Sequence, residues 1–233
     1  MPPLLETEWG ITSLHATGWY MPKRKIKKNY RSVTGVFPGN KSIGPAEFES
    51  TLERDLIILL EFAPQVLQYE VQPITIPWVD SEGKKRNYTP DALVKTTTRS
   101  IPQLLEVKYK SDLSENWQLL KEKHAAARKW ATSKGLKFNV ITENNIRGTY
   151  LENAKFLLNY SKSIPPVEMM ELVLNILNKN TKLKVNDLLA KAFHDEWRQA
   201  QLLTVVWYLV ATFQIDIDLN KKLTMESKLK WKP

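Results

Sequence analysis

The residues best suited to chemistry lie in two short segments, Pro90-Asp91 and, fifteen positions further along, Glu106-Val107-Lys108. Residues 103–110 have the composition of a β-strand, in which successive side chains point to opposite faces of the sheet. Glu106 and Lys108 are therefore predicted to share one face, about 7 Å apart. If Asp91 lies on the neighbouring strand, its carboxylate meets that of Glu106.

Two carboxylates that converge on one face of a sheet repel each other unless a cation lies between them. Oxygen ligands of this kind suit Mg²⁺, with Mn²⁺ as a substitute, and the main-chain carbonyl of Val107 is a further candidate ligand. Lys108 would then orient and help to deprotonate an attacking water, or stabilise the charge that builds up on a phosphate. The pattern fits phosphodiester hydrolysis, although a Glu-x-Lys pair on a strand also occurs as a plain surface ion pair.

The elements that would position these residues are predicted to form an α/β layer. A helix is expected from Pro45 to Pro64, because residues 48, 52, 56 and 59 are apolar at helical spacing. Short β-type segments follow at residues 66–71, 74–79, 87–94 and 103–110. A second helix is expected over residues 114–134, with Ser114 as its N-cap, and a further strand over 136–142. This alternation predicts an α/β fold and not a helical bundle.

A domain boundary is predicted at residues 161–166, where Pro165-Pro166 interrupts the chain. Beyond it lie helical patterns at residues 167–177, 186–193 and 196–211, then β-type segments at 213–219 and 223–231. Three helices followed by a hairpin predict a winged-helix-like domain, a module that binds either DNA or protein. Its ten basic and eight acidic residues nearly balance, which favours a protein partner.

The first 45 residues are predicted to form an irregular basic arm. The chain as a whole has a formal net charge of +9 and a pI of about 9.5, which favours a polyanionic partner. Basic residues are concentrated in one part of the arm, between aromatic neighbours, and we predict that they contact nucleic acid. These residues are Lys23, Arg24, Lys25, Lys27, Lys28 and Arg31.

Several classes of protein are excluded by composition. The chain has no cysteine, which rules out disulfides, thiolate zinc sites and a cysteine nucleophile. The beginning of the chain lacks the apolar core of a signal peptide, and the longest apolar stretch, 202–213, is too short to span a bilayer. A cytoplasmic protein without a membrane partner is therefore expected. The helical tryptophans at positions 117, 130, 197 and 207 are expected to be core residues.

Four segments carry a resemblance to a known family. They are Glu49-Ser50-Thr51-Leu52-Glu53-Arg54-Asp55, the segment 69–73 that ends in Gln72-Pro73, Tyr88-Thr89-Pro90-Asp91, and Leu105-Glu106-Val107-Lys108. Over residues 20–145 the chain resembles the N-terminal domain of the TnsA transposon endonucleases, and its C-terminal part resembles the second domain of that family more loosely. The resemblance implies a restriction-endonuclease-like mixed-sheet core followed by a winged-helix-like domain.

Site residues follow from the same resemblance. It implies that Asp91 and Glu106 are metal-binding carboxylates and that Lys108 is the catalytic lysine. Glu53 becomes the fourth member of the site, as an acidic ligand or through a water, and Glu49 is its main competitor. The implied domains are an arm at 1–45, a nuclease domain at 46–162 and a winged-helix-like domain at 163–233.

The resemblance also implies a bacterial, heteromeric transposase that acts on the double-stranded DNA of transposon ends. This chain would cleave the 5′ ends, a TnsB-like transposase would cut the 3′ ends, and a TnsC-like ATPase would regulate both. One alternative is a free-standing restriction or repair nuclease of the same fold. Another is a non-catalytic DNA-binding adaptor, against which the intact set of Asp91, Glu106 and Lys108 argues.

Overall fold

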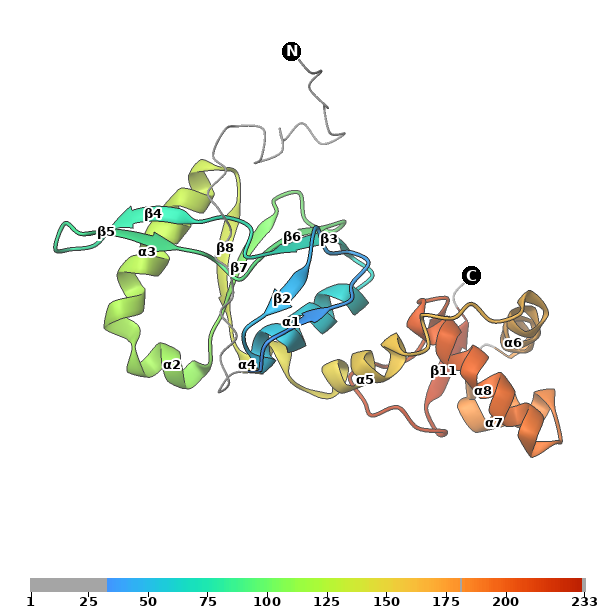
Figure 1. Ribbon diagram of the computed structural model, residues 1–233. Helices are drawn as coiled ribbons and strands as arrows, with labels where there is room; N and C mark the ends of the chain where they lie inside the picture. The colour runs from blue at the N-terminus through green and yellow to red at the C-terminus, as the bar shows by residue number, and fades with distance from the viewer. Residues whose placement is uncertain (1–32, 181, 232–233) are drawn as a thin grey trace, which may run out of the picture.

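The computed structural model describes residues 33–180 and 182–231, and Figure 1 shows an α/β part followed by a mainly helical part. The predicted DNA-contacting residues of the arm, Lys23 to Arg31, lie outside the described residues. Among the described residues, no helix combines the length and the apolar composition needed to cross a membrane.

A four-stranded mixed sheet forms the centre of the α/β part. Its spatial order is β3 (Val66–Val71), β6 (Ala92–Thr96), β7 (Gln103–Val107) and β8 (Lys137–Ile141). The first three strands are antiparallel to their neighbours, whereas β8 runs parallel to β7. The predicted mixed-sheet α/β fold is therefore confirmed.

Two helices cover opposite faces of this sheet (Figure 1). They are α1 (Thr51–Phe62) and α3 (Trp117–Ser133), the second of which follows the short α2 (Lys110–Glu115). Leu105 and Val107 of β7 pack into the α1-side core, while Leu104 packs with α3 and β8 on the other side. The predicted alternation along β7 therefore holds, and Glu106 lies on the α3 side.

The start of the first helix was expected at Pro45, and this was wrong. Residues 46–48 form β2 (Ala46–Phe48), which pairs with β1 (Gly35–Phe37), so the segment 33–45 is not wholly irregular. Helix α1 begins after Ser50, whose hydroxyl accepts the Glu53 N–H at 3.1 Å and so caps the first turn. The spacing of Phe48 and Leu52 fits a helix, but Phe48 belongs to the strand.

Two other boundaries also differ from the prediction. Ser114 is no N-cap, because it lies inside α2 and its hydroxyl donates to the carbonyl of Ser111. The segment 87–94 is not one strand but the end of β5 (Lys85–Tyr88) and the start of β6. Strand β5 pairs with β4 (Ile76–Val79) in a hairpin that extends from the sheet beside α3 (Figure 1).

The C-terminal part contains the three predicted helices and a small antiparallel sheet. The short α4 (Glu143–Ile146) follows β8 and packs with α1. The elements of the C-terminal part are α5 (Thr149–Leu158), α6 (Val167–Lys179), β9 (Lys182–Lys184), α7 (Val185–Ala192), α8 (Glu196–Ala211), β10 (Ile215–Asp216) and β11 (Lys228–Trp231). The sheet has the order β10-β11-β9, of which β9 was not predicted. That this module is a winged helix stays a prediction.

Helix α1 belongs to both cores. Its residues Leu52 and Leu56 pack beneath the central sheet, whereas Ile58 and Phe62 pack with α5 and the C-terminal helices. Helix α5 also contributes fully buried side chains to that second core, although the predicted division at residue 163 leaves it in the preceding domain. The core therefore divides before α5, close to the start of this helix.

Candidate active site

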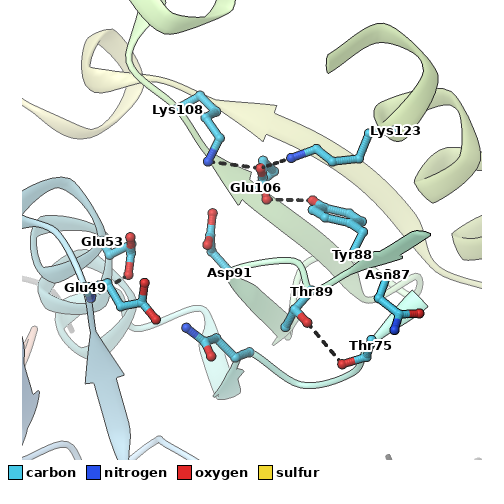
Figure 2. A pocket seen from close by; sticks show the side chains of 11 residues that line it. Glu49, Glu53, Thr75, Asn87, Tyr88, Thr89, Asp91, Glu106, Lys108 and Lys123 are labelled. Carbon is cyan, nitrogen blue, oxygen red and sulfur yellow. Dashed lines mark hydrogen bonds and ion pairs between the residues drawn. The ribbon is translucent and has the colours of Figure 1, made fainter. Parts of the chain in front are cut away.

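The two predicted segments meet at a pocket of about 570 Å³ between the N-terminal end of α1, the hairpin β4–β5 and helix α3. Its lining is almost entirely polar. It consists of Glu49, Glu53, Gln72, Thr75, Asn87, Tyr88, Thr89, Asp91, Glu106, Lys108 and Lys123. All four predicted catalytic residues therefore line one pocket (Figure 2).

Main-chain hydrogen bonds fix Asp91 opposite Glu106. Asp91 directly precedes β6, and its N–H donates to the carbonyl of Leu105 at 3.0 Å. In return the N–H of Val107 donates to Asp91 Oδ2 at 2.6 Å. The predicted convergence of the two carboxylates is therefore present, although Asp91 lies in the turn before the strand and not within it.

Glu106 is held by three donors from three different segments. Tyr88 Oη donates to Glu106 Oε2 at 2.6 Å, and Lys123 Nζ on α3 donates to Oε1 at 3.0 Å. Lys108 Nζ forms an ion pair with the same Oε1 at 3.1 Å. The side chain of Glu106 is only 2% exposed, so these contacts replace water around its charge.

The two carboxylates have opposite electrostatic surroundings. Burial opposes ionisation of Glu106, but Lys108, Lys123 and the Tyr88 hydroxyl together hold its pKa below the ordinary value. Burial raises the pKa of Asp91 well above the ordinary value, and the charges of Glu106 and Glu53 raise it further. The ammonium of Lys108 and the Val107 N–H only partly offset this. Asp91 therefore lies where an additional positive charge would be stabilised.

Lys108 lies between two of the predicted metal ligands. Its ammonium contacts Glu106 Oε1 and also donates to the carbonyl of Val107 at 3.1 Å. Burial lowers the pKa of Lys108, but Glu106, Asp91 and Glu53 outweigh burial and raise it above the ordinary value. Lys108 is thus a protonated cation surrounded by oxygen atoms.

Two acidic residues at the start of α1, Glu49 just before the N-cap and Glu53 in the first turn, approach the pocket from the other side (Figure 2). Glu53 Oε2 accepts the Glu49 N–H at 2.8 Å, and Oε1 accepts the Ser50 hydroxyl at 2.9 Å. Glu53 thus organises the start of the helix. Its charge also acts on both Asp91 and Lys108. Glu49 lines the same pocket, and the choice between the two as fourth member stays a prediction.

Sequence reasoning missed two residues of the site, Tyr88 and Lys123. Tyr88 lies within a segment that carries the family resemblance, so its position was a usable signal. Lys123 lies 4.5 Å above the Tyr88 ring and reaches Glu106 only because α3 crosses that face of the sheet. Gln72 also lines the pocket with φ of 46°, a left-handed backbone that is uncommon outside glycine, and its N–H donates to the carbonyl of Asp91.

Within residues 33–180 and 182–231, no group of three or more His, Cys, Asp or Glu side chains is close enough to hold a metal ion as it stands. The potential metal ligands near Asp91 are all oxygen atoms, which are the ligands that Mg²⁺ prefers. A cationic ammonium already lies among them. A divalent cation at these residues therefore requires that Lys108, whose side chain is 30% exposed, leave Glu106 and the carbonyl of Val107.

Comparison with protein families agrees with this geometry. The family described as TnsA-like endonuclease N terminal matches residues 63–143, and the family described as TnsA endonuclease C terminal matches residues 145–219. Asp91, Glu106 and Lys108 lie inside the first match, whereas Glu53 precedes it. A comparison with curated proteins found no match. The two family matches are consecutive and together cover most of the chain, and we conclude that the chain belongs to the TnsA endonuclease family.

Proposed function

We propose that this chain is the Mg²⁺-dependent endonuclease subunit of a heteromeric transposase and that it cleaves the 5′ ends of the transposon. One observation carries the proposal: Asp91, Glu106 and Lys108 converge on one polar pocket in a chain of the TnsA endonuclease family. Membership of this family favours transposition over a free-standing restriction or repair nuclease.

Asp91, Glu106, the carbonyl of Val107 and Glu53 would hold the cation, and Mn²⁺ would substitute for Mg²⁺. A bound divalent ion would neutralise the phosphate and make the attacking water more acidic. Asp91 gains most from such an ion, because its own pocket leaves its charge only partly balanced. Tyr88 and Lys123 would keep Glu106 ionised and oriented while Lys108 turns away from it.

Lys108 would act through its charge. In the arrangement without a bound cation, Glu106, Asp91 and Glu53 outweigh burial and raise the pKa of Lys108, so its resting form is an ammonium ion. In hydrolysis the water loses a proton as its oxygen bonds to phosphorus, and the bond from phosphorus to the departing oxygen breaks as that oxygen gains a proton. Negative charge builds on the phosphate oxygens between these events. A nearby ammonium stabilises that charge. This supports the second of the two roles considered for Lys108, the stabilisation of charge on the phosphate.

The partners proposed for this activity are double-stranded DNA at the transposon ends, a TnsB-like transposase that cuts the 3′ ends and a TnsC-like ATPase regulator. The basic residues from Lys23 to Arg31 would add phosphate contacts. Family membership supports a role inside a transposase, and the partners themselves are inferred from that role.

The test is strand-specific nicking by the reconstituted complex. Asp91→Ala should still assemble on transposon ends and allow 3′ nicking, while 5′ nicking falls by about 10²–10³ or more, because a metal ligand is lost. The exposed carboxylate Glu115 on α2 provides a control, and Glu115→Ala should leave both strands cut normally. Undiminished 5′ nicking by Asp91→Ala would place the active site elsewhere.

A paired experiment separates Glu53 from Glu49. If Glu53 is the fourth member of the site, Glu53→Gln should reduce Mg²⁺ affinity, measured by calorimetry, more than Glu49→Gln does. The opposite ranking would assign the role to Glu49.

A further inference from the structure

Most basic residues of the C-terminal part lie on one surface, together with three of its acidic residues, Asp216, Asp218 and Glu226. Basic side chains gather on the small sheet β10-β11-β9 and on the loop that leads to β11. They are Lys182, Lys184, Lys221, Lys222, Lys228 and Lys230. Helix α8, by contrast, is buried mainly in its C-terminal half, and its exposed N-terminal half carries one basic residue, Arg198, with one acidic residue, Glu196.

The strand register brings four of these lysines together in pairs. Lys228 lies opposite Lys184, and Lys230 lies opposite Lys182, on the adjacent antiparallel strands β11 and β9. The residue between them on β11, Leu229, is fully buried and faces the core. Because side chains alternate along a strand, all four lysines project from the opposite, outer face of the sheet. We call these four residues the lysine face.

Like charges directly opposite each other destabilise a sheet. Acidic residues balance only part of the lysine face: Glu226 pairs with Lys184 at 2.7 Å, and Lys230 lies opposite Asp216 in the register and interacts with the charge of Asp218. Within the described part of the chain, neither Lys182 nor Lys228 forms an ion pair. Lys182 and Lys228 are therefore exposed ammonium groups that a polyanion could contact.

Lysine is also used to protect the edges of sheets from pairing with other chains. That explanation covers β9, which is an edge strand. It does not cover Lys228 and Lys230, because β11 is the central strand and both of its edges are already paired. Two lysines on a central strand, matched by two on its neighbour, indicate a binding face.

We propose that the lysine face binds the phosphate backbone of duplex DNA, as a second contact away from the catalytic pocket. The inference rests on the proposed function in one respect, namely that the polyanion is the DNA that the nuclease cuts. Lysines two positions apart on a strand are separated by about 7 Å, and adjacent strands by about 5 Å. Such a cluster of flexible point charges suits neighbouring phosphates and reads no base sequence. The sheet, and not α8, would then face the DNA.

The test measures binding of the full chain to a fluorescently labelled duplex of about 30 base pairs as salt is varied. Lys182→Gln, Lys228→Gln and Lys230→Gln are combined in one variant. The control variant combines Lys162→Gln, Lys179→Gln and Lys191→Gln, three exposed residues of the same lobe outside the lysine face. Each variant loses the same charge. The slope of log affinity against log salt should fall by about 2 to 3 in the first variant and remain near the wild-type value in the control.

A second measurement needs no substitution. Acetylation of the unaltered chain, followed by mass spectrometry, should show that DNA protects Lys182, Lys228 and Lys230 but not Lys191. Equal slopes in the two variants, or absence of this protection, would overturn the inference and would favour an acidic protein as the partner of this face. The thermal midpoint of the first variant should not fall, because all three substituted side chains are exposed.

The inference and the proposed function fail separately. If Asp91→Ala abolishes 5′ nicking and the lysine-face variant keeps the wild-type slope, only the inference is wrong. If the slope falls as expected but Asp91→Ala still nicks the 5′ strand, the lysine face stands and the proposed active site is wrong.

Discussion

Two buried carboxylates in this molecule, Glu106 and Asp55, have similar contacts, but only the first lies at the candidate active site. The side chain of Glu106 is 2% exposed and contacts Lys108 and Lys123. The side chain of Asp55 on α1 is 4% exposed and contacts Arg147 at 3.0 Å and Lys155 at 3.1 Å. Each is thus an acidic group held by two cations, of which only Lys108 is a near neighbour in the sequence.

The neighbours of these carboxylates distinguish them. Glu106 has a second carboxylate, Asp91, beside it at an open pocket. Asp55 has a third cation, Arg54, nearby at 3.6 Å and does not line that pocket. Its ion pairs join α1 to the segment around α5, so they fasten the two cores together. A buried, paired carboxylate is therefore no mark of a site by itself, whereas negative charge left partly unbalanced at a pocket is such a mark.

The largest expected difference in cleavage rate is between alanine variants of two lysines, each of which pairs with one of these carboxylates. Lys108→Ala should slow 5′ cleavage by about 10²–10³ with little change in stability, because Lys123 and Tyr88 still hold Glu106. Lys155→Ala should leave the cleavage rate of the folded protein unchanged. It should lower the free energy of unfolding by about 1 kcal/mol, since the lysine is partly exposed and Arg147 remains. Nicking assays and urea denaturation give the two readouts.

A loss of cleavage in Lys155→Ala as large as that in Lys108→Ala, with stability preserved, would contradict the comparison. It would mean that the ion pairs of Asp55 affect the geometry of the active site and do not only hold the two cores together.

Local patterns were enough to predict most elements of the fold. Strand β3 and helix α8 have the predicted bounds, and the side chain of Asp195 caps the start of α8. The error at the start of α1 was avoidable, since Ser50 and Glu53 have the spacing of a helix cap that the structure uses. The tryptophans show the limit of such patterns. Trp207 is buried as expected, but Trp117 and Trp197 are 50% and 72% exposed.

The candidate site was predictable only where its residues are close in sequence. Asp91, Glu106 and Lys108 follow from strand alternation and from the resemblance. Lys123 could not be predicted, because its contact with Glu106 depends on how α3 crosses the sheet. The lysine face was missed for the same reason: a charge count over a segment contains no information on strand register.

The second prediction compares two matched substitutions of opposite effect. Asp55→Asn should lower the free energy of unfolding by about 2 kcal/mol, because Arg147 and Lys155 lose charged partners but can turn partly to water. Asp91→Asn should raise it in the absence of divalent ions, because it removes a charge that burial, Glu106 and Glu53 disfavour. Urea denaturation at neutral pH checks both, and destabilisation by Asp91→Asn would contradict the proposed charge imbalance.

The unfavourable charge of Asp91 should also make stability depend on pH, with a smaller effect than that of the Asp91→Asn substitution. The raised pKa of Asp91 means that the folded chain keeps a proton which the unfolded chain releases above the ordinary pKa of 3.8. Stability of the wild type should therefore fall, relative to Asp91→Asn, as pH rises from 3.8 through the raised pKa. Saturating Mg²⁺ should remove this relative fall if Asp91 is a ligand. The measurement is the thermal midpoint of both proteins across that pH range, with and without Mg²⁺. Parallel curves of the two proteins without Mg²⁺ would argue against a raised pKa of Asp91.

The smallest expected effect comes from deleting one hydroxyl in each cluster. Tyr88 Oη donates to Glu106 at 2.6 Å, whereas Tyr109 Oη accepts from Arg147 at 3.3 Å, beside Asp55. Tyr88→Phe should slow 5′ cleavage by about tenfold or less, since one hydrogen bond to a carboxylate contributes on the order of 1.4 kcal/mol and two lysines still hold Glu106. The loss should appear in the single-turnover rate and not in DNA affinity, because the hydroxyl orients a carboxylate and touches no DNA. Tyr109→Phe should change neither quantity. Equal rate losses in the two variants would show that both hydroxyls act through general packing. The hydroxyl beside Glu106 would then have no catalytic role that the one beside Asp55 lacks.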